Sequence, residues 1–208
     1  MTNPSTPLPT AGNATTHLLY LHGFRSSPQS AKARLMAAHV AQHHPNLQFW
    51  SPQLPPSPRA AMELVSAGLA DWPKQRMAVV GSSLGGYYAS WVAQQMCCPS
   101  VLLNPAVNPA RDLAQYIGTQ TAQWHAPDEH FFFAPEFVAE LRAFDVRDAP
   151  PAAPQMAIVA KGDEVLDWRE MVARYPQAKL RLLDGGDHGL SDFASHIEGI
   201  VRFLQLAK

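Results

Sequence analysis

Short apolar runs alternate with longer amphipathic stretches along most of this chain. The alternation is typical of parallel strands joined by crossover helices, because both faces of such a sheet are buried. Six runs have the length of strands and are bounded by turn residues. They are 17–21, 47–50, 77–81, 100–103, 156–160 and 180–183. The pattern predicts an α/β fold with a mainly parallel sheet of about six strands and helices on both faces.

Four further stretches carry apolar residues at helical spacing. They are 30–44, with Leu35, Met36, Val40 and Ala41; 57–71, with Met62, Leu64, Val65 and Leu69; 84–96; and 193–206, with Phe193, Ile197, Ile200, Val201 and Leu204. We expect each stretch to be an amphipathic helix whose apolar stripe packs against the sheet.

The connection between the fourth and fifth predicted strands is unusually long, about fifty residues where a simple connection needs far fewer. Two weaker helical stretches fall within it, at 109–117 and 135–144. It also carries a group of aromatic side chains, namely Trp124, His125, Phe131, Phe132, Phe133 and Phe137. We interpret 105–154 as a small helical cap over a site. The alternative is a second packing layer with no part in binding.

The chain has 208 residues, of which 47% are hydrophobic, and a formal net charge of -1. This length supports one core, and the balanced charge gives no reason to expect a nucleic-acid partner. We expect a flexible lead over 1–16 and a single domain over 17–208. The lead resembles no secretory signal and no apolar run is long enough to span a membrane, so a cytoplasmic protein is predicted. The two cysteines, Cys97 and Cys98, are adjacent and are expected to be reduced thiols.

The third predicted strand is followed directly by Gly81-Ser82-Ser83-Leu84-Gly85 and then by a helix. A strand, a sharp turn and a helix form the setting of a nucleophile elbow. In such a turn Ser83 adopts strained dihedral angles, and the glycines two positions to either side avoid a collision. The other interpretation is a tight Gly-Ser turn that only caps the helix. The context favours Ser83 as a nucleophile.

A serine hydroxyl needs a base to remove its proton and an acid to orient that base. His188 lies in a glycine-rich loop between the last strand and the last helix, the position where this base belongs. The acid should follow the fifth strand, where Asp163, Glu164 and Asp167 occur. We predict that Asp163 is the acid, that Glu164 faces water and that Asp167 caps the helix beginning at Trp168.

The other histidines fit the role of base less well. His39, His43 and His44 fall on or at the end of a predicted helix, where we expect them to be solvated. His125 and His130 lie in the predicted cap, where they either touch a substrate or lie at the surface without a role.

An oxyanion that forms on an attacked carbonyl is stabilised by two backbone amides, each worth about 3 kcal/mol. Leu84, directly after the nucleophile, offers one of them. The loop after the first strand contains Gly23, which lets the backbone approach closely and leaves the amide of Phe24 as the second donor. His22 is expected to brace this loop, the alternative being a contact with substrate. Arg25 is either a solvated charge or a contact for an anionic part of the substrate.

Several segments together resemble the YqiA-type bacterial esterases, a UPF0227-like family. They are Leu-Tyr-Leu-His-Gly-Phe at 19–24, Ser-Ser-Pro at 26–28, Pro-Gln-Leu-Pro-Pro at 52–56, Val-Gly-Ser-Ser-Leu-Gly-Gly-Tyr-Tyr at 80–88, Asn-Pro-Ala-Val at 104–107 and Gly-Asp-Glu-Val-Leu-Asp at 162–167. The resemblance runs from about residue 18 to residue 204 and is loose across 108–154. It implies an α/β-hydrolase fold and a small cytoplasmic carboxylic-ester hydrolase without a cofactor. In the family pattern the nucleophile, acid and base fall on Ser83, Asp163 and His188.

These observations predict a serine hydrolase that cleaves small or acyl-chain esters, or thioesters, through an acyl-enzyme on Ser83. Two other interpretations stay open. One is a ligand-binding protein that keeps the fold without catalysis, and the other is a lyase that uses the same three residues. We expect no metal and no cofactor, a small-molecule substrate, and either a monomer or a small homo-oligomer.

Overall fold

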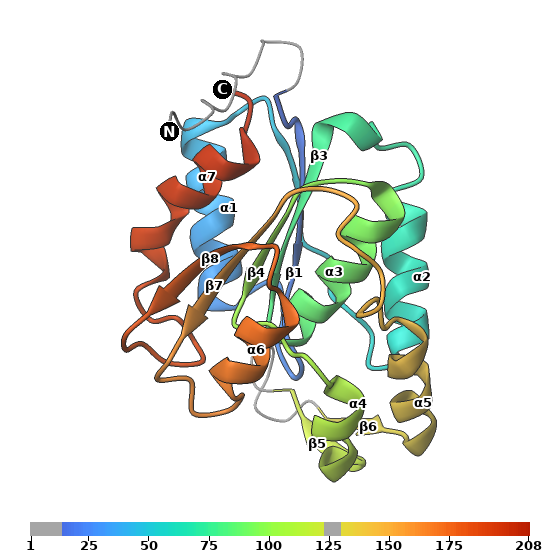
Figure 1. Ribbon diagram of the computed structural model, residues 1–208. Helices are drawn as coiled ribbons and strands as arrows, with labels where there is room; N and C mark the ends of the chain where they lie inside the picture. The colour runs from blue at the N-terminus through green and yellow to red at the C-terminus, as the bar shows by residue number, and fades with distance from the viewer. Residues whose placement is uncertain (1–13, 123–129) are drawn as a thin grey trace.

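The computed structural model describes residues 14–122 and 130–208. Its centre is a six-stranded sheet in the order β2-β1-β3-β4-β7-β8, in which every neighbouring pair is parallel (Figure 1). In chain order the strands are β1 His17–Leu21, β2 Gln48–Trp50, β3 Met77–Ser82, β4 Ser100–Leu103, β7 Gln155–Ala160 and β8 Lys179–Leu183. All six predicted strands are confirmed, each to within one residue at either end.

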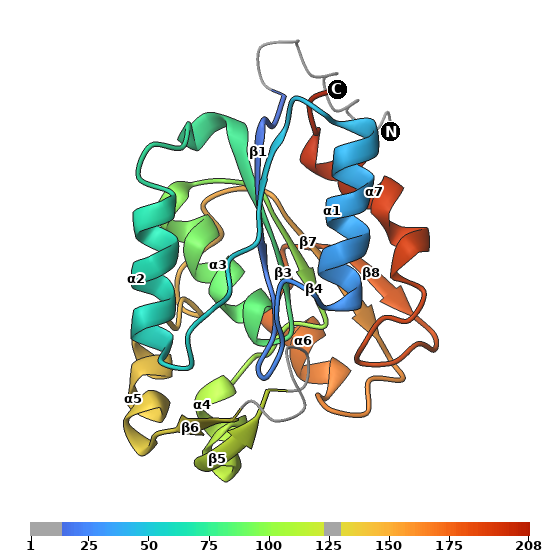
Figure 2. The same ribbon diagram turned by 180° about the vertical axis from the view of Figure 1, so that it is seen from behind.

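Helices cover both faces of the sheet (Figures 1 and 2). On one face lie α1 Ala31–His43 and α7 Ile197–Leu204, the latter preceded by the short helix η4 Phe193–His196; on the other lie α2 Pro58–Gly68, α3 Leu84–Met96 and α6 Trp168–Arg174. Strand β1 shows why both faces need cover. Its Leu18 and Tyr20 pack on the side of α1 and α7, whereas Leu19 and Leu21 pack on the side of α2 and α3, and all four are fully buried.

The buried stripes of the first two helices differ in part from the prediction. Leu35 and Leu64, which we expected to face the sheet, are each 41% exposed, and Ala41 is exposed as well. Leu35 is next to the buried Met36 and Leu64 is next to the buried Val65, and successive helical positions point about 100° apart. The residues that α1 and α2 bury are Ala33, Met36 and Val40, and Pro58, Ala61, Met62 and Val65.

The long connection between β4 and β7 lies at the carboxyl ends of the strands, at the lower end of Figure 1. Its elements are α4 Pro109–Asp112, the 3-10 helix η3 Ala114–Tyr116, β5 Gly118–Thr121, β6 His130–Phe133 and α5 Pro135–Ala143. The expected helices are present but shorter, and the antiparallel hairpin of β5 and β6 was not predicted. Strand β5 reads Gly-Thr-Gln-Thr, which lacks the apolar alternation that would mark a strand. Trp124 and His125 fall outside the described residues.

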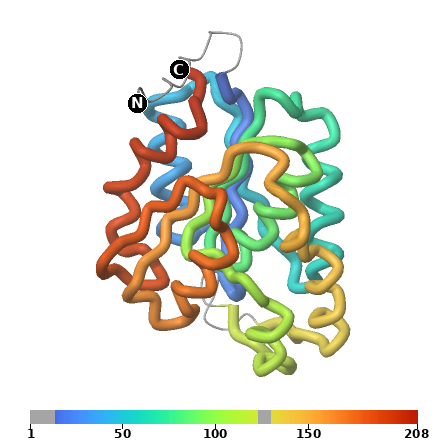
Figure 3. Tube along the Cα trace, viewed as in Figure 1, coloured from blue at the N-terminus to red at the C-terminus, as the bar shows by residue number. Residues whose placement is uncertain are grey.

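The start of the described chain and its carboxyl end lie together at the end of the sheet away from the cap (Figure 3). Thr15 forms a parallel bridge with Leu206, and its hydroxyl donates to the carbonyl of Leu204 at 2.6 Å. His44 Nδ1 donates to the carbonyl of Ala207 at 2.7 Å. His44 is buried under the chain end that it contacts, and the expectation that it is solvated was wrong. Of the expected flexible lead, residues 1–13 fall outside the described part.

The two cysteines are free, Cys97 at the surface and Cys98 buried behind the end of α3. Burial raises the pKa of the Cys98 thiol to about 12, which keeps it protonated and unreactive. Within the described ranges, no helix combines the length and apolar character needed to cross a membrane.

Candidate active site

Ser83 occupies the sharp turn between β3 and α3, at the carboxyl end of the sheet. Its φ of 56° and ψ of -121° lie outside the usual regions for a residue with a side chain. Neighbouring backbone atoms lie so close to Gly81 and Gly85 that neither position has room for a side chain. A Cβ added to Gly81 would lie 2.1 Å from the carbonyl oxygen of Gly85, and one added to Gly85 would lie 2.0 Å from that of Leu21. The two glycines thus let the turn sit directly against β1.

The ring of His188 lies between Ser83 and Asp163. Its Nε2 is 3.1 Å from Ser83 Oγ, and its Nδ1 is 2.8 Å from Asp163 Oδ2. Because a carboxylate only accepts hydrogen bonds, Nδ1 carries the proton and Nε2 is free to accept from the serine hydroxyl. This is the tautomer that a general base for serine requires. The fold thus brings the three predicted residues into contact, although the serine and the histidine are 105 positions apart in the sequence.

Asp163 follows β7, and its side chain is completely buried, whereas that of His188 is 20% exposed. Its Oδ1 accepts from the backbone amides of Val165 and Leu166, both at 2.8 Å, while Oδ2 accepts from His188. Three donors compensate the carboxylate for the loss of water. They also fix the direction in which Oδ2 points, and so the orientation of the imidazole.

The two neighbouring carboxylates have other partners. Asp167 caps α6, where its Oδ1 accepts from the amide of Arg169 at 2.9 Å, as predicted. Glu164 is exposed, as predicted, yet its Oε2 also accepts from the backbone N–H of His188 at 3.0 Å. Of the three candidates for the acid, Asp163 alone contacts the imidazole ring, and Glu164 helps to fix the backbone that carries it.

The loop after β1 lies directly against the nucleophile. A Cβ added to Gly23 would lie 3.1 Å from Ser83 Cβ and 3.5 Å from its Oγ. Phe24 and Leu84 line the same cavity as Ser83 and His188. Among the described residues, neither the Phe24 nor the Leu84 amide donates a hydrogen bond to another backbone group. Both amides are thus available to an oxyanion formed beside Ser83.

His22 and Arg25 lie on either side of this loop's tip. His22 is 3% exposed; its Nδ1 donates to the carbonyl of Gly23 at 3.0 Å, and its Nε2 accepts from the amide of Leu54 at 3.2 Å. The two bonds tie the loop after β1 to the segment after β2, which is the bracing that we expected. Arg25 has a positive φ of 55°, and its side chain lies toward the cap, with one nitrogen 3.5 Å from Gln120 Oε1.

Asn104 is a buried residue beside the site that sequence reasoning missed. Its Nδ2 donates to the carbonyls of Asp187 at 3.0 Å and His188 at 3.2 Å, and its Oδ1 accepts from the amide of Ala160 at 2.8 Å. One side chain at the end of β4 therefore joins the end of β7 to the histidine loop. The available signal was an asparagine directly after a buried strand, a residue type that tolerates the positive φ of 40° found there.

Lys32 holds the histidine loop from the other side. Its Nζ donates to the carbonyl of Gly189 at 2.6 Å. Burial lowers the pKa of this amine, and the carboxylates of Asp187 and Asp163 oppose that shift. The loop that carries the base is thus bound both to the sheet and to α1.

Two cavities adjoin the nucleophile, one on each side of Phe24, Arg25 and Leu84, which line both. The first, of about 310 Å³, also contains Ser83 and His188, and we call it the histidine-side cavity. The second, of about 260 Å³, extends toward the segment after β2 and the hairpin, and its lining includes His22, Leu54 and Phe131. We call it the loop-side cavity. Cap residues line both cavities, so the cap lies over the site.

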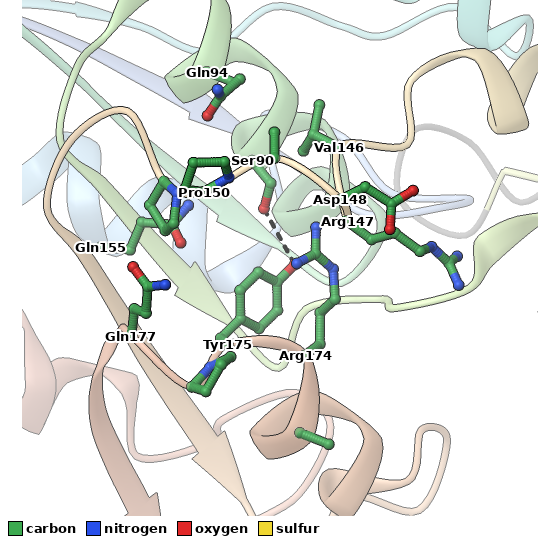
Figure 4. Close-up of a pocket in the computed structure, with 14 residues that line it drawn as sticks. Ser90, Gln94, Val146, Arg147, Asp148, Pro150, Gln155, Arg174, Tyr175 and Gln177 are labelled. Carbon is green, nitrogen blue, oxygen red and sulfur yellow. Dashed lines mark hydrogen bonds between the residues drawn. The ribbon is translucent and has the colours of Figure 1, made fainter.

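A larger cavity, of about 510 Å³, lies away from these residues (Figure 4). Ser90 and Gln94 of α3 lie on one side of it, and Arg174, Tyr175 and Gln177 lie on the other. The hydroxyls of Ser90 and Tyr175 are 3.1 Å apart and satisfy each other. No residue of the candidate triad lines this cavity, so size alone does not locate the active site. Within the described part of the chain, no three His, Cys, Asp or Glu side chains are grouped so that they could hold a metal ion.

The parallel sheet, the strand-turn-helix at Ser83 and the cap after the fourth strand of the sheet define an α/β-hydrolase fold. Solved structures agree. The mouse alpha/beta hydrolase domain-containing protein 10 matches with a TM-score of 0.69 at 15% identity, covering 91% of this chain and 91% of that one. An esterase domain from Rhodothermus marinus matches with a TM-score of 0.69 at 16% identity, covering 95% of this chain and 90% of that one. Est1E from Butyrivibrio proteoclasticus, with bound ferulic acid, matches with a TM-score of 0.66 at 14% identity, covering 93% of this chain and 88% of that one.

A family model matches residues 17–205, which is nearly all of the chain. The chain belongs to the uncharacterised protein family UPF0227. The family assignment that the sequence motifs indicated is thereby confirmed.

Proposed function

We propose that this protein is a serine hydrolase that cleaves carboxylic esters, thioesters included, through an acyl-enzyme on Ser83. The observation that carries the proposal is the continuous hydrogen-bonded line from Ser83 Oγ through His188 to the buried carboxylate of Asp163. A serine in strained backbone geometry, hydrogen-bonded to an imidazole of the correct tautomer, is arranged for nucleophilic attack.

In the first half of the reaction His188 Nε2 takes the proton of Ser83 as Oγ bonds to the carbonyl carbon. The carbonyl oxygen becomes an oxyanion, and the amides of Phe24 and Leu84 donate to it. Asp163 stays ionised and stabilises the imidazolium. When the tetrahedral intermediate collapses, the bond to the leaving oxygen or sulfur breaks, and the leaving group takes the proton from His188. The acyl group remains on the serine.

In the second half a water molecule replaces the departed alcohol or thiol. His188 removes a proton from this water, whose oxygen attacks the acyl carbon. The second intermediate collapses with cleavage of the bond to Oγ, and the serine regains its proton from His188. The products are a carboxylic acid and an alcohol or thiol. This chain's own side chains and backbone amides, together with water, supply every group in the cycle.

The sizes of the cavities indicate the size of the substrate. Volumes of about 310 and 260 Å³ are at the small end for ligand sites and suit short groups on both sides of the ester bond. We therefore expect 4-nitrophenyl esters of short acids to be turned over faster than those of long fatty acids.

The test is covalent labelling combined with turnover. A fluorophosphonate probe should modify the folded wild-type protein at Ser83, and digestion with mass spectrometry locates the label. Ser83→Ala should lose the label and reduce turnover of 4-nitrophenyl butyrate by at least about 10³-fold. The matched control Ser66→Ala removes an exposed hydroxyl on α2 and should change neither readout. Turnover that persists in a folded Ser83→Ala variant would refute the assignment.

A further inference from the structure

Arg25 is a cation beside the nucleophile for which the described residues provide no acidic partner. Its guanidinium reaches Gln120 Oε1 at a long 3.5 Å and lies 5.9 Å from the centre of the Tyr116 ring. A guanidinium has five N–H donors, and these contacts occupy one of them. Most of its hydrogen-bonding capacity is therefore directed at water or at a ligand.

The backbone of Arg25 also points to a role for its side chain. A φ of 55° places a residue with a side chain in the left-handed region, where glycine is favoured. Gln120, which holds the guanidinium, is itself fixed by a bond of 2.7 Å from its Nε2 to the carbonyl of Tyr116. The cap thus holds the guanidinium over the boundary between the two cavities. Strained backbone conformations of this kind cluster at functional sites.

The two cavities differ in charge. The histidine-side cavity includes the carboxylate of Asp112, which pairs with Arg111 at 2.7 Å. The described lining of the loop-side cavity contains no Asp or Glu, and Arg25 is its only Arg or Lys. An anion that enters the loop-side cavity would therefore meet the charge of Arg25 with no carboxylate among the described lining residues.

A second group in the loop-side cavity favours the same kind of ligand. Tyr88 lines this cavity, and the residue as a whole is 3% exposed. Burial raises the pKa of this phenol, which keeps the hydroxyl a donor. A phenol hydroxyl that stays protonated can donate a hydrogen bond to a ligand oxygen in the cavity.

The reaction decides which part of the substrate enters each cavity. His188 must deliver a proton to the leaving group, so that group belongs in the cavity that His188 lines. The acyl chain then extends to the other side of the Phe24 and Leu84 amides, into the loop-side cavity. At about 260 Å³, this cavity takes a short chain.

We propose that the acyl part of the substrate is short and ends in a carboxylate that Arg25 binds, with the Tyr88 hydroxyl as a second donor. The inference rests on the proposed ester hydrolysis and specifies its substrate class as half-esters of short dicarboxylic acids. Arg25 is the residue that determines this specificity.

The experiment compares matched esters. The 4-nitrophenyl half-ester of glutaric acid is compared with 4-nitrophenyl pentanoate, of similar length but uncharged. In a second pair, 4-acetoxybenzoate and its methyl ester, the charge is on the leaving group. In the wild type, kcat/KM for the glutarate half-ester should exceed that for the pentanoate by about tenfold or more, and added salt should reduce the ratio. The second pair should show no such preference.

Variants assign the effect to residues. Arg25→Gln should bring the glutarate-to-pentanoate ratio to about one or below, and Tyr88→Phe should lower it several-fold. Arg34→Gln removes the same charge from the exposed face of α1 and should leave the ratio and the rates unchanged. A wild-type ratio of one, a ratio insensitive to Arg25→Gln, or a preference for the anionic leaving group would overturn the proposal.

A binding measurement keeps this inference separate from the proposed function. Glutarate should raise the Tm of the wild-type protein and of Ser83→Ala, but not that of Arg25→Gln. If glutarate stabilises the protein through Arg25 while no ester is turned over, the anion site stands and the hydrolase proposal fails. If esters are turned over without regard to charge and glutarate has no effect on Tm, the anion site fails and the hydrolase proposal stands.

Discussion

The residues of the candidate triad and the cap that faces them are held in place by different kinds of contact. At the elbow, backbone packs against backbone so closely that Gly81 and Gly85 admit no side chain, and buried hydrogen bonds fix Asp163. In the cap the contacts are between aromatic side chains, and they meet at Phe24, whose ring centre lies 5.2 Å from that of Phe133. Backbone contacts of the first kind tolerate almost no substitution, whereas side-chain contacts can be repacked.

The difference in contacts corresponds to a difference in role between the sheet edge and the cap. The sheet edge positions the groups of the proposed mechanism, and the cap shapes the two cavities beside them. A cap can change its side chains and so its substrate while the serine, acid and base stay in place. The variants below test this division, from the largest expected effect to the smallest.

Asp163→Asn should have the largest effect, because an asparagine amide can donate to His188 Nδ1 and favour the tautomer that cannot accept a proton from Ser83. We expect kcat for a short 4-nitrophenyl ester to fall by about 10⁴-fold with little change in the melting temperature. Asp167→Asn is the matched control, since an asparagine also caps α6, and it should retain activity within a few-fold. Equal losses in the two variants would show that Asp163 has no special role.

Phe133→Ala tests whether the cap has a core of its own. Phe133 is 1% exposed and contacts both Phe24 and Phe137, so its truncation should lower the free energy of unfolding by about 3–5 kcal/mol. Its neighbour Phe132 is 60% exposed on the same strand, and Phe132→Ala should cost less than about 0.5 kcal/mol. Chemical denaturation of both variants measures the difference, and equal costs would mean that the hairpin does not pack as described.

Gly85→Ala tests the backbone contact at the elbow. The added methyl group would meet the carbonyl oxygen of Leu21 at 2.0 Å, so the turn must shift, at a cost of about 3 kcal/mol. Gly185→Ala serves for comparison, because a Cβ there has no neighbour within 4 Å. We expect a lower melting temperature and reduced probe labelling of Ser83 in the first variant only. Unchanged stability in Gly85→Ala would show that the elbow is looser than the glycine contacts indicate.

Asn104→Ala should have the smallest effect of the buried changes, because Asn104 acts through the histidine loop and not on the substrate. Its loss leaves the amide of Ala160 and the carbonyls of Asp187 and His188 without this partner, at a cost of about 1–3 kcal/mol. If Asn104 positions the base, kcat should fall by about tenfold with KM unchanged. A loss of stability with kcat unchanged would limit the residue to a structural role.

Local pattern was enough to predict much of the molecule. The four inner strands of the main sheet, β1, β3, β4 and β7, are short apolar runs with both faces buried, so their positions follow from the order of residues alone. Ser83, Asp163 and His188 could be predicted as a candidate triad because each lies in the turn or loop after a strand, and the carboxyl ends of parallel strands meet at one edge. Of the three leucines expected on the buried stripes of the first two helices, Leu69 is buried but Leu35 and Leu64 are exposed, because helix orientation depends on what the helix packs against.

The tertiary structure alone decided which distant groups meet. Nothing local marks Asn104 as the partner of a loop 83 positions away, or Glu164 as the acceptor of the His188 amide. Strand β5 forms only because β6 pairs with it across the cap. The position of the Arg25 charge beside the two cavities likewise depends on where the cap lies. Local propensity is determined by neighbours in the chain, whereas hydrogen bonds and charges between distant segments exist only once the chain has folded.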